Sequence, residues 1–129
     1  MIYLDNAATT MIKPEAVGRA MTDAMRRAAQ ALIGEHDFTA FCSNRHMKKS
    51  AVRTLRSIQI DRHGDELRIL LTGNGFLYNM VRIIVGTLIE AGRGERDADN
   101  IAAALQSRDR KNAGFTAPAQ GLCLWDVRY

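Results

Sequence analysis

The sequence contains few of the residues that mark specialised classes of protein. It has two cysteines, two prolines and one tryptophan in 129 residues. Cys42 and Cys123 lie far apart without a Cys-x-x-Cys pair, which argues against a zinc site and predicts reduced thiols. No run approaches the roughly 18 apolar residues of a membrane span, and residues 1–20 lack the basic and apolar regions of a signal peptide. We therefore expect a cytoplasmic protein without a metal site.

The residues that are present are those of a globular domain. Hydrophobic residues make up 47% and charged residues 25%, so the chain lacks the apolar deficit that marks disorder. Its length suits a single compact unit. Lysine and arginine number 18 against 14 acidic residues, a net charge of +4. This mild excess favours a polyanionic partner, although an ordinary solvated surface explains it equally simply.

The amino-terminal part of the sequence predicts a strand and one helix. Residues 1–5 have a strand-like pattern, and residues 6–10 read as a polar turn. Residues 22–33 repeat apolar side chains at three- and four-residue spacing, which predicts a helix ending at Gly34. Residues 35–50 are polar and basic and predict a loop.

The rest of the sequence completes an α+β pattern. Residues 52–61 and 66–72 predict a hairpin. Residues 76–90 are apolar on nearly all sides and predict a buried helix, followed by an amphipathic helix over 98–107 and a closing strand over 121–129. This order predicts a mostly antiparallel sheet covered by helices on one face.

Arg82 does not fit the plain core that surrounds it. It stands between Val81 and Ile83 in the predicted buried helix. Burying a guanidinium costs several kcal/mol unless acidic and other acceptors meet it. Arg82 therefore either reaches solvent, pairs with an acid such as Asp126, or points into a site where it holds a carboxylate ionised or binds a phosphate. The apolar pattern alone does not choose between these interpretations.

A family resemblance extends over residues 21–129. The matching blocks are residues 31–38 with Phe41, 52–54, 74–88, 92–94, 108–110, 113–114, 116–118 and 121–122. In this order they resemble the carboxyl-terminal domain of the tRNA pseudouridine synthase A family. The resemblance implies a pseudouridine synthase fold, isomerisation of uridine in the anticodon stem-loop of tRNA, and no cofactor.

The resemblance also assigns roles to individual residues. The family's arginine at the position of Arg82 pairs with the catalytic aspartate, and its leucine at the position of Leu122 packs against the target uracil. Asn74 is a candidate substrate contact, with a turn or capping role as the alternative. His36 and Asp37 are expected to hold their loop by hydrogen bonds.

The family's partners are implied in the same way. Its members resemble one another in being homodimers that grip tRNA across a basic cleft, so we expect tRNA and a second copy as partners. The candidate phosphate contacts are Arg45, Lys48, Lys49 and Arg53. The alternative for this run is an ordinary solvated face.

The resemblance implies a catalytic aspartate that this sequence does not contain. Pseudouridine formation needs one aspartate as nucleophile or base on a flipped-out nucleotide, and the family's lies in an Arg-Thr-Asp-Ala-Gly motif in the amino-terminal half. Thr22, Asp23 and Ala24 repeat part of it, but Met21 and Met25 replace its arginine and glycine. A cap at a helix start explains Thr22 or Asp23 better. We therefore expect a truncated enzyme part, inactive alone; the alternatives are a non-catalytic RNA-binding or dimerisation remnant and an inert fusion fragment.

The first 20 residues carry a different resemblance. Residues 2–10 with Pro14, Glu15, Ala16 and Val17 resemble the amino terminus of cysteine desulfurases, which belong to the class V aminotransferase fold and bind pyridoxal phosphate. The lysine region and the cofactor-binding sheet of those enzymes do not follow, so no pyridoxal phosphate is expected. We divide the chain into a leader, residues 1–20, and a synthase-like domain, residues 21–129.

Overall fold

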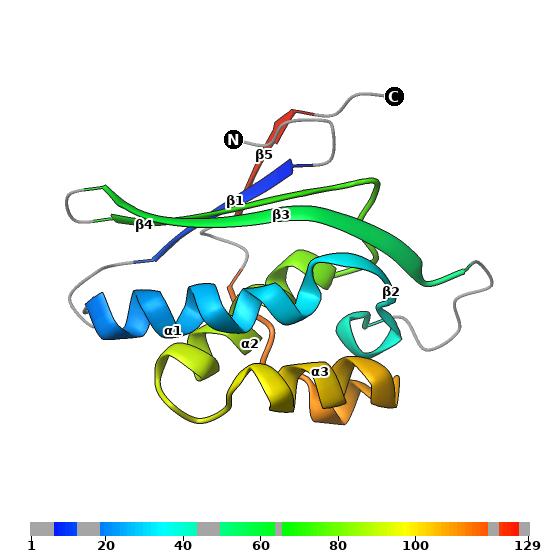
Figure 1. The fold of residues 1–129 in the computed structure, drawn as a ribbon. Coiled ribbons are helices and arrows are strands. Elements are labelled where there is room, and N and C mark those ends of the chain that lie inside the picture. The colour runs from blue at the N-terminus through cyan, green and yellow to red at the C-terminus, as the bar shows by residue number, and fades with distance from the viewer. Residues whose placement is uncertain (1–6, 13–18, 44–49, 64–65, 119–121, 127–129) are drawn as a thin grey trace.

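A five-stranded antiparallel sheet organises the molecule. The computed structural model describes residues 7–12, 19–43, 50–63, 66–118 and 122–126. The strands lie in the order β2-β3-β4-β1-β5, and the helices cover one face of the sheet (Figure 1). The predicted fold class is confirmed. Within the described ranges, none of the helices has both the length and the apolar character that crossing a bilayer requires.

The predicted hairpin forms the centre of the sheet. β3 (Val52–His63) pairs with β4 (Glu66–Gly73), and β2 (Gly34–Asp37) adds to the other side of β3. In β4, Leu67, Ile69 and Leu71 are fully buried, because alternate side chains of a strand point to the same face. The alternation of apolar residues in the sequence therefore predicts which face of β4 is buried.

Two predictions for short segments are wrong. The expected turn over residues 6–10 is instead part of β1 (Ala7–Ile12), which pairs with β4 on one side and with β5 (Leu122–Asp126) on the other. Strand preference depends on what a segment pairs with, and here both edges of β1 find backbone partners. The expected loop over 35–50 likewise begins as β2, while residues 1–5 lie outside the described part of the chain.

The helices agree with the predictions more closely. α1 (Arg19–Ala29) begins earlier than expected and continues as a 3₁₀ turn, and Gly34 follows with φ 106°. α2 (Met80–Gly92) begins four residues later than its apolar run, and ten of its 13 residues are buried, which confirms the buried helix. α3 (Ala98–Ser107) has the predicted bounds. Asp97 caps α3 by accepting from the backbone N–H of Asn100 at 2.8 Å.

His36 and Asp37 make the expected hydrogen bonds at the two ends of β2: His36 bonds to the residue before the strand, and Asp37 bonds to the turn after it. His36 Nε2 lies 2.9 Å from the carbonyl oxygen of Ile33. Asp37 Oδ1 accepts from both the hydroxyl and the backbone N–H of Thr39, and Asp37 Oδ2 lies 3.5 Å from Arg108 Nε. The Thr39 hydroxyl bond, then the Thr39 amide and the Arg108 charge, lower the pKa of Asp37 and outweigh burial, which raises it.

Replacing Asp37 with asparagine is expected to lower the unfolding free energy by about 1 kcal/mol at neutral pH, because a charge-assisted hydrogen bond is weakened. A depressed folded pKa means that this stability is present above the unfolded value, 3.8. It is lost as the pH falls through the lower folded value. Urea unfolding at pH 7 and at about pH 2.5 measures the difference. Glu35→Gln removes the same charge two residues earlier as a control, and an equal loss at both pH values in Asp37→Asn would refute the assignment.

Candidate functional site

Arg82 lies in the first turn of α2, partly buried, and its side chain is held by two neutral groups. Its Nε donates to the carbonyl oxygen of Ala117 at 2.7 Å, and its Nη1 donates to Oδ1 of Asn79 at 3.1 Å. The backbone carbonyl of Arg82 accepts in turn from the N–H of Ala117 at 3.0 Å. The guanidinium is therefore fixed in direction from two sides, by a backbone carbonyl and a side-chain amide.

The charge of Arg82 is not neutralised by any acid whose side chain the structure describes. The ion pairs seen there join other residues. Asp126, the acid considered from the sequence, has its backbone in β5, and its side chain lies outside the described set. A guanidinium has further N–H donors beyond the two bonded here. Arg82 is thus suited to receive a carboxylate or a phosphate in a planar, two-pronged arrangement.

Asn79 is a site residue that the sequence reasoning missed. It adopts a left-handed conformation with φ 61° directly before α2. Its Nδ2 donates to Ser43 Oγ at 3.2 Å, and the N–H of Ser43 donates to the carbonyl of Tyr78 at 3.2 Å. The available signal was an asparagine three residues before Arg82, because that spacing puts two side chains of a helix turn side by side and asparagine tolerates positive φ.

The carbonyl that holds Arg82 belongs to an extended segment, residues 113–117, packed along α2. Thr87 is fully buried; its hydroxyl donates to the carbonyl of Ile83 at 2.7 Å and accepts from the N–H of Gly114 at 2.9 Å. Arg110 Nη1 donates to the carbonyl of Gly114 at 2.8 Å. These bonds fix the segment where Ala117 reaches Arg82.

The two other predicted substrate contacts, Asn74 and Leu122, lie at the ends of two strands of the sheet. Asn74 follows β4 and is exposed; its Oδ1 accepts from the N–H of Thr54 at 2.9 Å and its own N–H donates to the Thr54 carbonyl at 3.0 Å. Both bonds run to the facing strand β3, so Asn74 continues the β3–β4 pairing past Gly73. Leu122 opens β5 with its backbone opposite Thr10, and its side chain lies outside the described set.

The basic run is described only at one end. Arg45, Lys48 and Lys49 fall outside the described residues. Arg53 turns back on its own chain, with Nη1 donating to the carbonyls of Ser50 at 2.8 Å and Val52 at 2.7 Å.

The suggested capping role of Thr22 or Asp23 at a helix start is wrong, because α1 begins at Arg19 and places both residues inside the helix. Asp23 Oδ1 instead lies 3.5 Å from Arg26 Nη1 at the surface.

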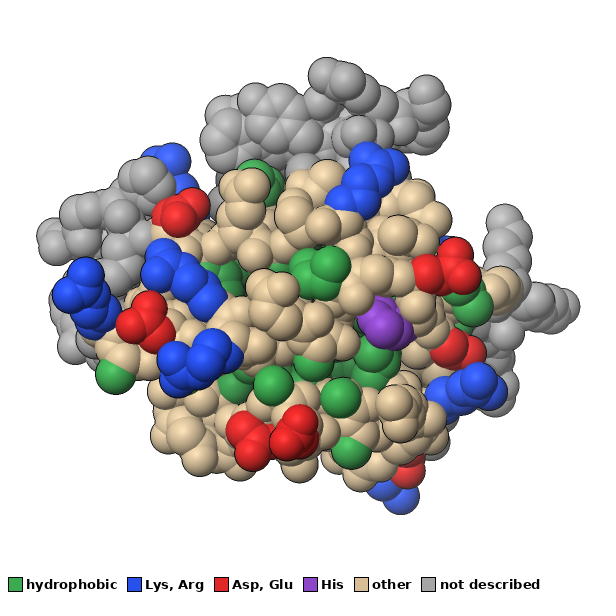
Figure 2. All heavy atoms as spheres, in the orientation of Figure 1, with side chains coloured by type: hydrophobic (Ala, Val, Ile, Leu, Met, Phe, Trp, Pro, Cys, Tyr) green, Lys and Arg blue, Asp and Glu red, His purple; other side chains and the backbone are tan. Residues whose placement is uncertain are grey.

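Charge is mixed rather than basic on the side of the molecule that Figure 2 shows. Figure 2 shows blue and red side chains alternating on the side where α1 begins. Arg26 has acids on two sides: its Nη1 lies 3.5 Å from Asp23 Oδ1, and its Nη2 lies 3.8 Å from Asp61 Oδ1. Within the described ranges, no group of three His, Cys, Asp or Glu side chains is arranged to hold a metal ion.

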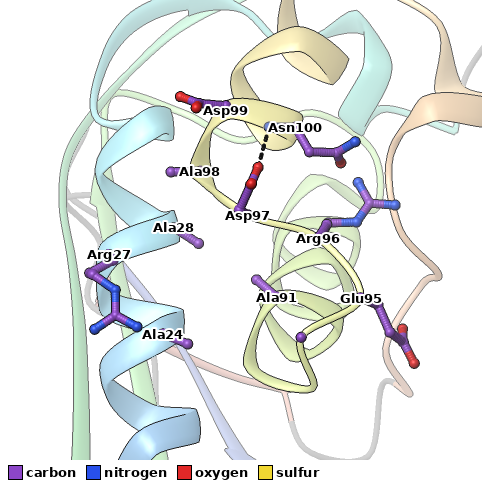
Figure 3. Close-up of a pocket in the computed structure, with 11 residues that line it drawn as sticks. Ala24, Arg27, Ala28, Ala91, Glu95, Arg96, Asp97, Ala98, Asp99 and Asn100 are labelled. Atoms are coloured by element: carbon purple, nitrogen blue, oxygen red, sulfur yellow. Dashed lines mark hydrogen bonds between the residues drawn. The ribbon is translucent and has the colours of Figure 1, made fainter.

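A separate hollow of about 680 Å³ lies between α1, the end of α2 and the start of α3. Figure 3 shows its centre lined by the methyl groups of Ala24, Ala28, Ala91 and Ala98, with Glu95 turned away from it. Ala91 lies nine residues after Arg82, roughly 14 Å along the helix axis. The hollow is therefore not part of the Arg82 site.

Comparison with known proteins gives a consistent result. Residues 28–129 match the sequence family described as tRNA pseudouridine synthase. The tRNA pseudouridine synthase A of Brevibacillus brevis is 51% identical over 107 residues, which are 83% of this chain and 44% of the relative. The protein of the same name from Lysinibacillus sphaericus is 50% identical over 121 residues, 94% of this chain and 47% of the relative. The chain thus spans about half the length of these relatives.

Proposed function

The chain belongs to the tRNA pseudouridine synthase family, and we propose that it is the carboxyl-terminal half of an A-type enzyme that converts uridine to pseudouridine in the anticodon stem-loop of tRNA. One observation supports this above the others. Arg82 is held by neutral acceptors, Ala117 and Asn79, so its charge is available to an anion from outside the described residues. A plain core residue would need an internal acid.

In the proposed reaction, Arg82 holds the catalytic carboxylate ionised. The bond between C1′ and N1 of the uridine breaks, the base turns, C5 bonds to C1′, the proton on C5 is released, and N1 takes up a proton. A cation within about 4–6 Å lowers the pKa of a carboxylate by 1–3 units, which keeps it ready to act as nucleophile or base. The sequence has no Arg-Thr-Asp-Ala-Gly motif, so we propose that an amino-terminal half supplies the carboxylate and that the chain alone is inactive.

The remaining residues of the proposal contact tRNA. Leu122 packs against the target uracil, and Asn74 has its Nδ2 left for substrate because its Oδ1 already accepts from Thr54. The phosphate contacts are Arg45, Lys48, Lys49 and Arg53. The assembled enzyme acts as a dimer in the cytoplasm, where tRNA is modified.

For the leader, residues 1–20, we propose a structural role. Its strand β1 bonds to β4 and β5, so it belongs to the same sheet as the synthase-like domain, residues 21–129. The Lysinibacillus alignment covers 121 of the 129 residues, which leaves eight outside and includes at least twelve of the first 20. We propose no pyridoxal phosphate chemistry for these residues.

The test is tritium release from tRNA that carries [5-³H]uridine. The chain is assayed alone and joined to the amino-terminal half of the Lysinibacillus enzyme, either mixed or fused into one polypeptide; we call the joined form the reconstituted enzyme. We expect release only from the reconstituted enzyme. If neither form releases tritium, salt-dependent tRNA binding by the chain would support the non-catalytic RNA-binding alternative. No activity and no binding would support an inert fragment.

A further inference from the structure

The side chain of Asn79 is not used in the usual way for its position. Asparagine directly before a helix commonly has an extended conformation and accepts a hydrogen bond from a backbone N–H of the first turn. Asn79 has φ 61°, and its side chain makes no such cap bond. The left-handed region is unfavourable for an L-residue, although less so for asparagine than for most others. The backbone thus occupies a less favourable region while the usual cap bond is absent.

What Asn79 does instead is hold Arg82 and tie it to a second segment. Oδ1 accepts from Arg82 Nη1 at 3.1 Å, and Nδ2 donates to Ser43 Oγ at 3.2 Å. With Oδ1 on the arginine, the Arg82 guanidinium is bonded at both Nε and Nη1, so rotation about its Nε–Cζ bond is blocked. The bond to Ser43 stops the amide from turning over.

The acceptor is also of the right charge type. An amide oxygen directs the guanidinium without neutralising it, whereas a carboxylate at the same place would form an ion pair across one helix turn. A site that must receive an anion needs a neutral acceptor such as this amide oxygen, which leaves the positive charge of the guanidinium in place.

We propose that Asn79 is the positioning residue of Arg82, which sets the direction of the guanidinium while leaving its charge for the incoming anion. The expected effect on catalysis rests on the proposed function. The hydrogen bond from Arg82 to Asn79 can be tested in the chain alone, so a failure of the proposed function and a failure of this inference can be told apart.

Three substitutions isolate the role. Asn79→Gly accepts φ 61° and removes both bonds of the side chain. Asn79→Asp keeps an acceptor for Arg82 and adds the charge that the native residue avoids. Arg108→Gly is the matched control, because Arg108 has φ 57° at the end of α3. Arg108→Gly places glycine at a second left-handed position, in a part of the chain that does not hold Arg82. Thermal unfolding verifies that each variant folds.

Two readouts are taken from each variant. In the ¹⁵N NMR spectrum of the chain alone, the Arg82 side-chain resonances, assigned by their loss in Arg82→Met, should show restricted Nε–Cζ rotation in the native chain and in Asn79→Asp. Rotation should be fast in Asn79→Gly. In the reconstituted enzyme, kcat should fall about 10- to 100-fold in both Asn79 variants with KM for tRNA changed less than about threefold, because a misdirected or neutralised arginine acts on the transition state. Arg108→Gly should match the native enzyme in both readouts.

Restricted rotation that persists in Asn79→Gly would overturn the inference whatever the activity. So would native kcat in both Asn79 variants, or a loss of kcat in Arg108→Gly equal to theirs. If the native reconstituted enzyme is inactive, the proposed function fails, and the NMR comparison still decides whether Asn79 holds Arg82.

Discussion

Replacing Arg82 with methionine is expected to lower kcat/KM of the reconstituted enzyme by about 10³-fold or more, a transition-state loss of about 4 kcal/mol. Methionine fills similar space but offers no charge to the catalytic carboxylate that we propose as the partner of Arg82. Charge stabilisation in a site shielded from water is commonly the largest single contribution to catalysis. Tritium release at limiting tRNA measures the ratio directly.

The pH profile separates charge from shape. Without Arg82 the partner carboxylate loses a nearby cation, so its pKa should rise by about 1–3 units. The acid limb of kcat/KM should then move to higher pH by the same amount in Arg82→Met. Arg82→Lys retains the charge but not the two bonded nitrogens, so we expect an intermediate loss of about 10- to 100-fold with the acid limb close to its native position.

Arg26 offers a matched control. Its Nε donates to the carbonyl of Ile60 at 2.8 Å, as Arg82 does to Ala117, but Asp23 and Asp61 lie beside it. Arg26→Met should leave kcat/KM within about twofold of the native value. Native activity in Arg82→Met, or an equal loss in Arg26→Met, would refute a specific role for Arg82.

The sequence predicts those helices and strands in which the apolar pattern repeats several times. The β3–β4 hairpin alternates apolar residues, α2 is apolar on nearly all sides, and α3 has a regular stripe, so each was found near its true place. β1 and β2 have no such pattern. β1 depends on backbone bonds to β4 and β5, which lie far along the chain. A local pattern does not contain that information.

The same limit applies to the site. Arg82 is conspicuous because it interrupts an apolar helix, and the sequence motif places it within the family. Its partners are not conspicuous: the carbonyl of Ala117 comes from 35 residues further along, and a carbonyl is present in every residue. Asn79 takes part through a backbone conformation that no residue type dictates. Only the folded chain shows that Arg82 is held by neutral groups.

Stability and the proposed chemistry meet on α2. The segment 113–117 packs so closely on this helix that a Cβ added at Gly86 would lie 1.8 Å from the carbonyl oxygen of Phe115. That segment also carries Ala117, whose carbonyl holds Arg82. Glycine at position 86 is therefore required by the approach of a backbone, not by its own conformation.

Replacing Gly86 with alanine is accordingly expected to lower the unfolding free energy by about 2–3 kcal/mol, because overpacking forces a backbone shift. Alanine stabilises a helix by about 1 kcal/mol relative to glycine. The expected loss of about 2–3 kcal/mol is the net change, with this favourable contribution already included. The shift should also move Ala117 away from Arg82, and kcat of the reconstituted enzyme should fall together with stability. Urea unfolding and tritium release measure the two effects.

Gly92 in the same helix supplies the control. A Cβ there would lie 2.6 Å from Cγ of Met21 and 2.9 Å from Cγ of Met25, so side chains rather than a backbone segment would have to shift. Gly92→Ala should therefore lower the unfolding free energy by about 1–2 kcal/mol, less than Gly86→Ala, and leave kcat unchanged because Ala117 stays in place. Equal destabilisation in the two variants would show that α2 resists any added methyl group. Native stability in Gly86→Ala would show that residues 113–117 do not pack against the helix as described, and the bond from Arg82 to Ala117 would lose its support.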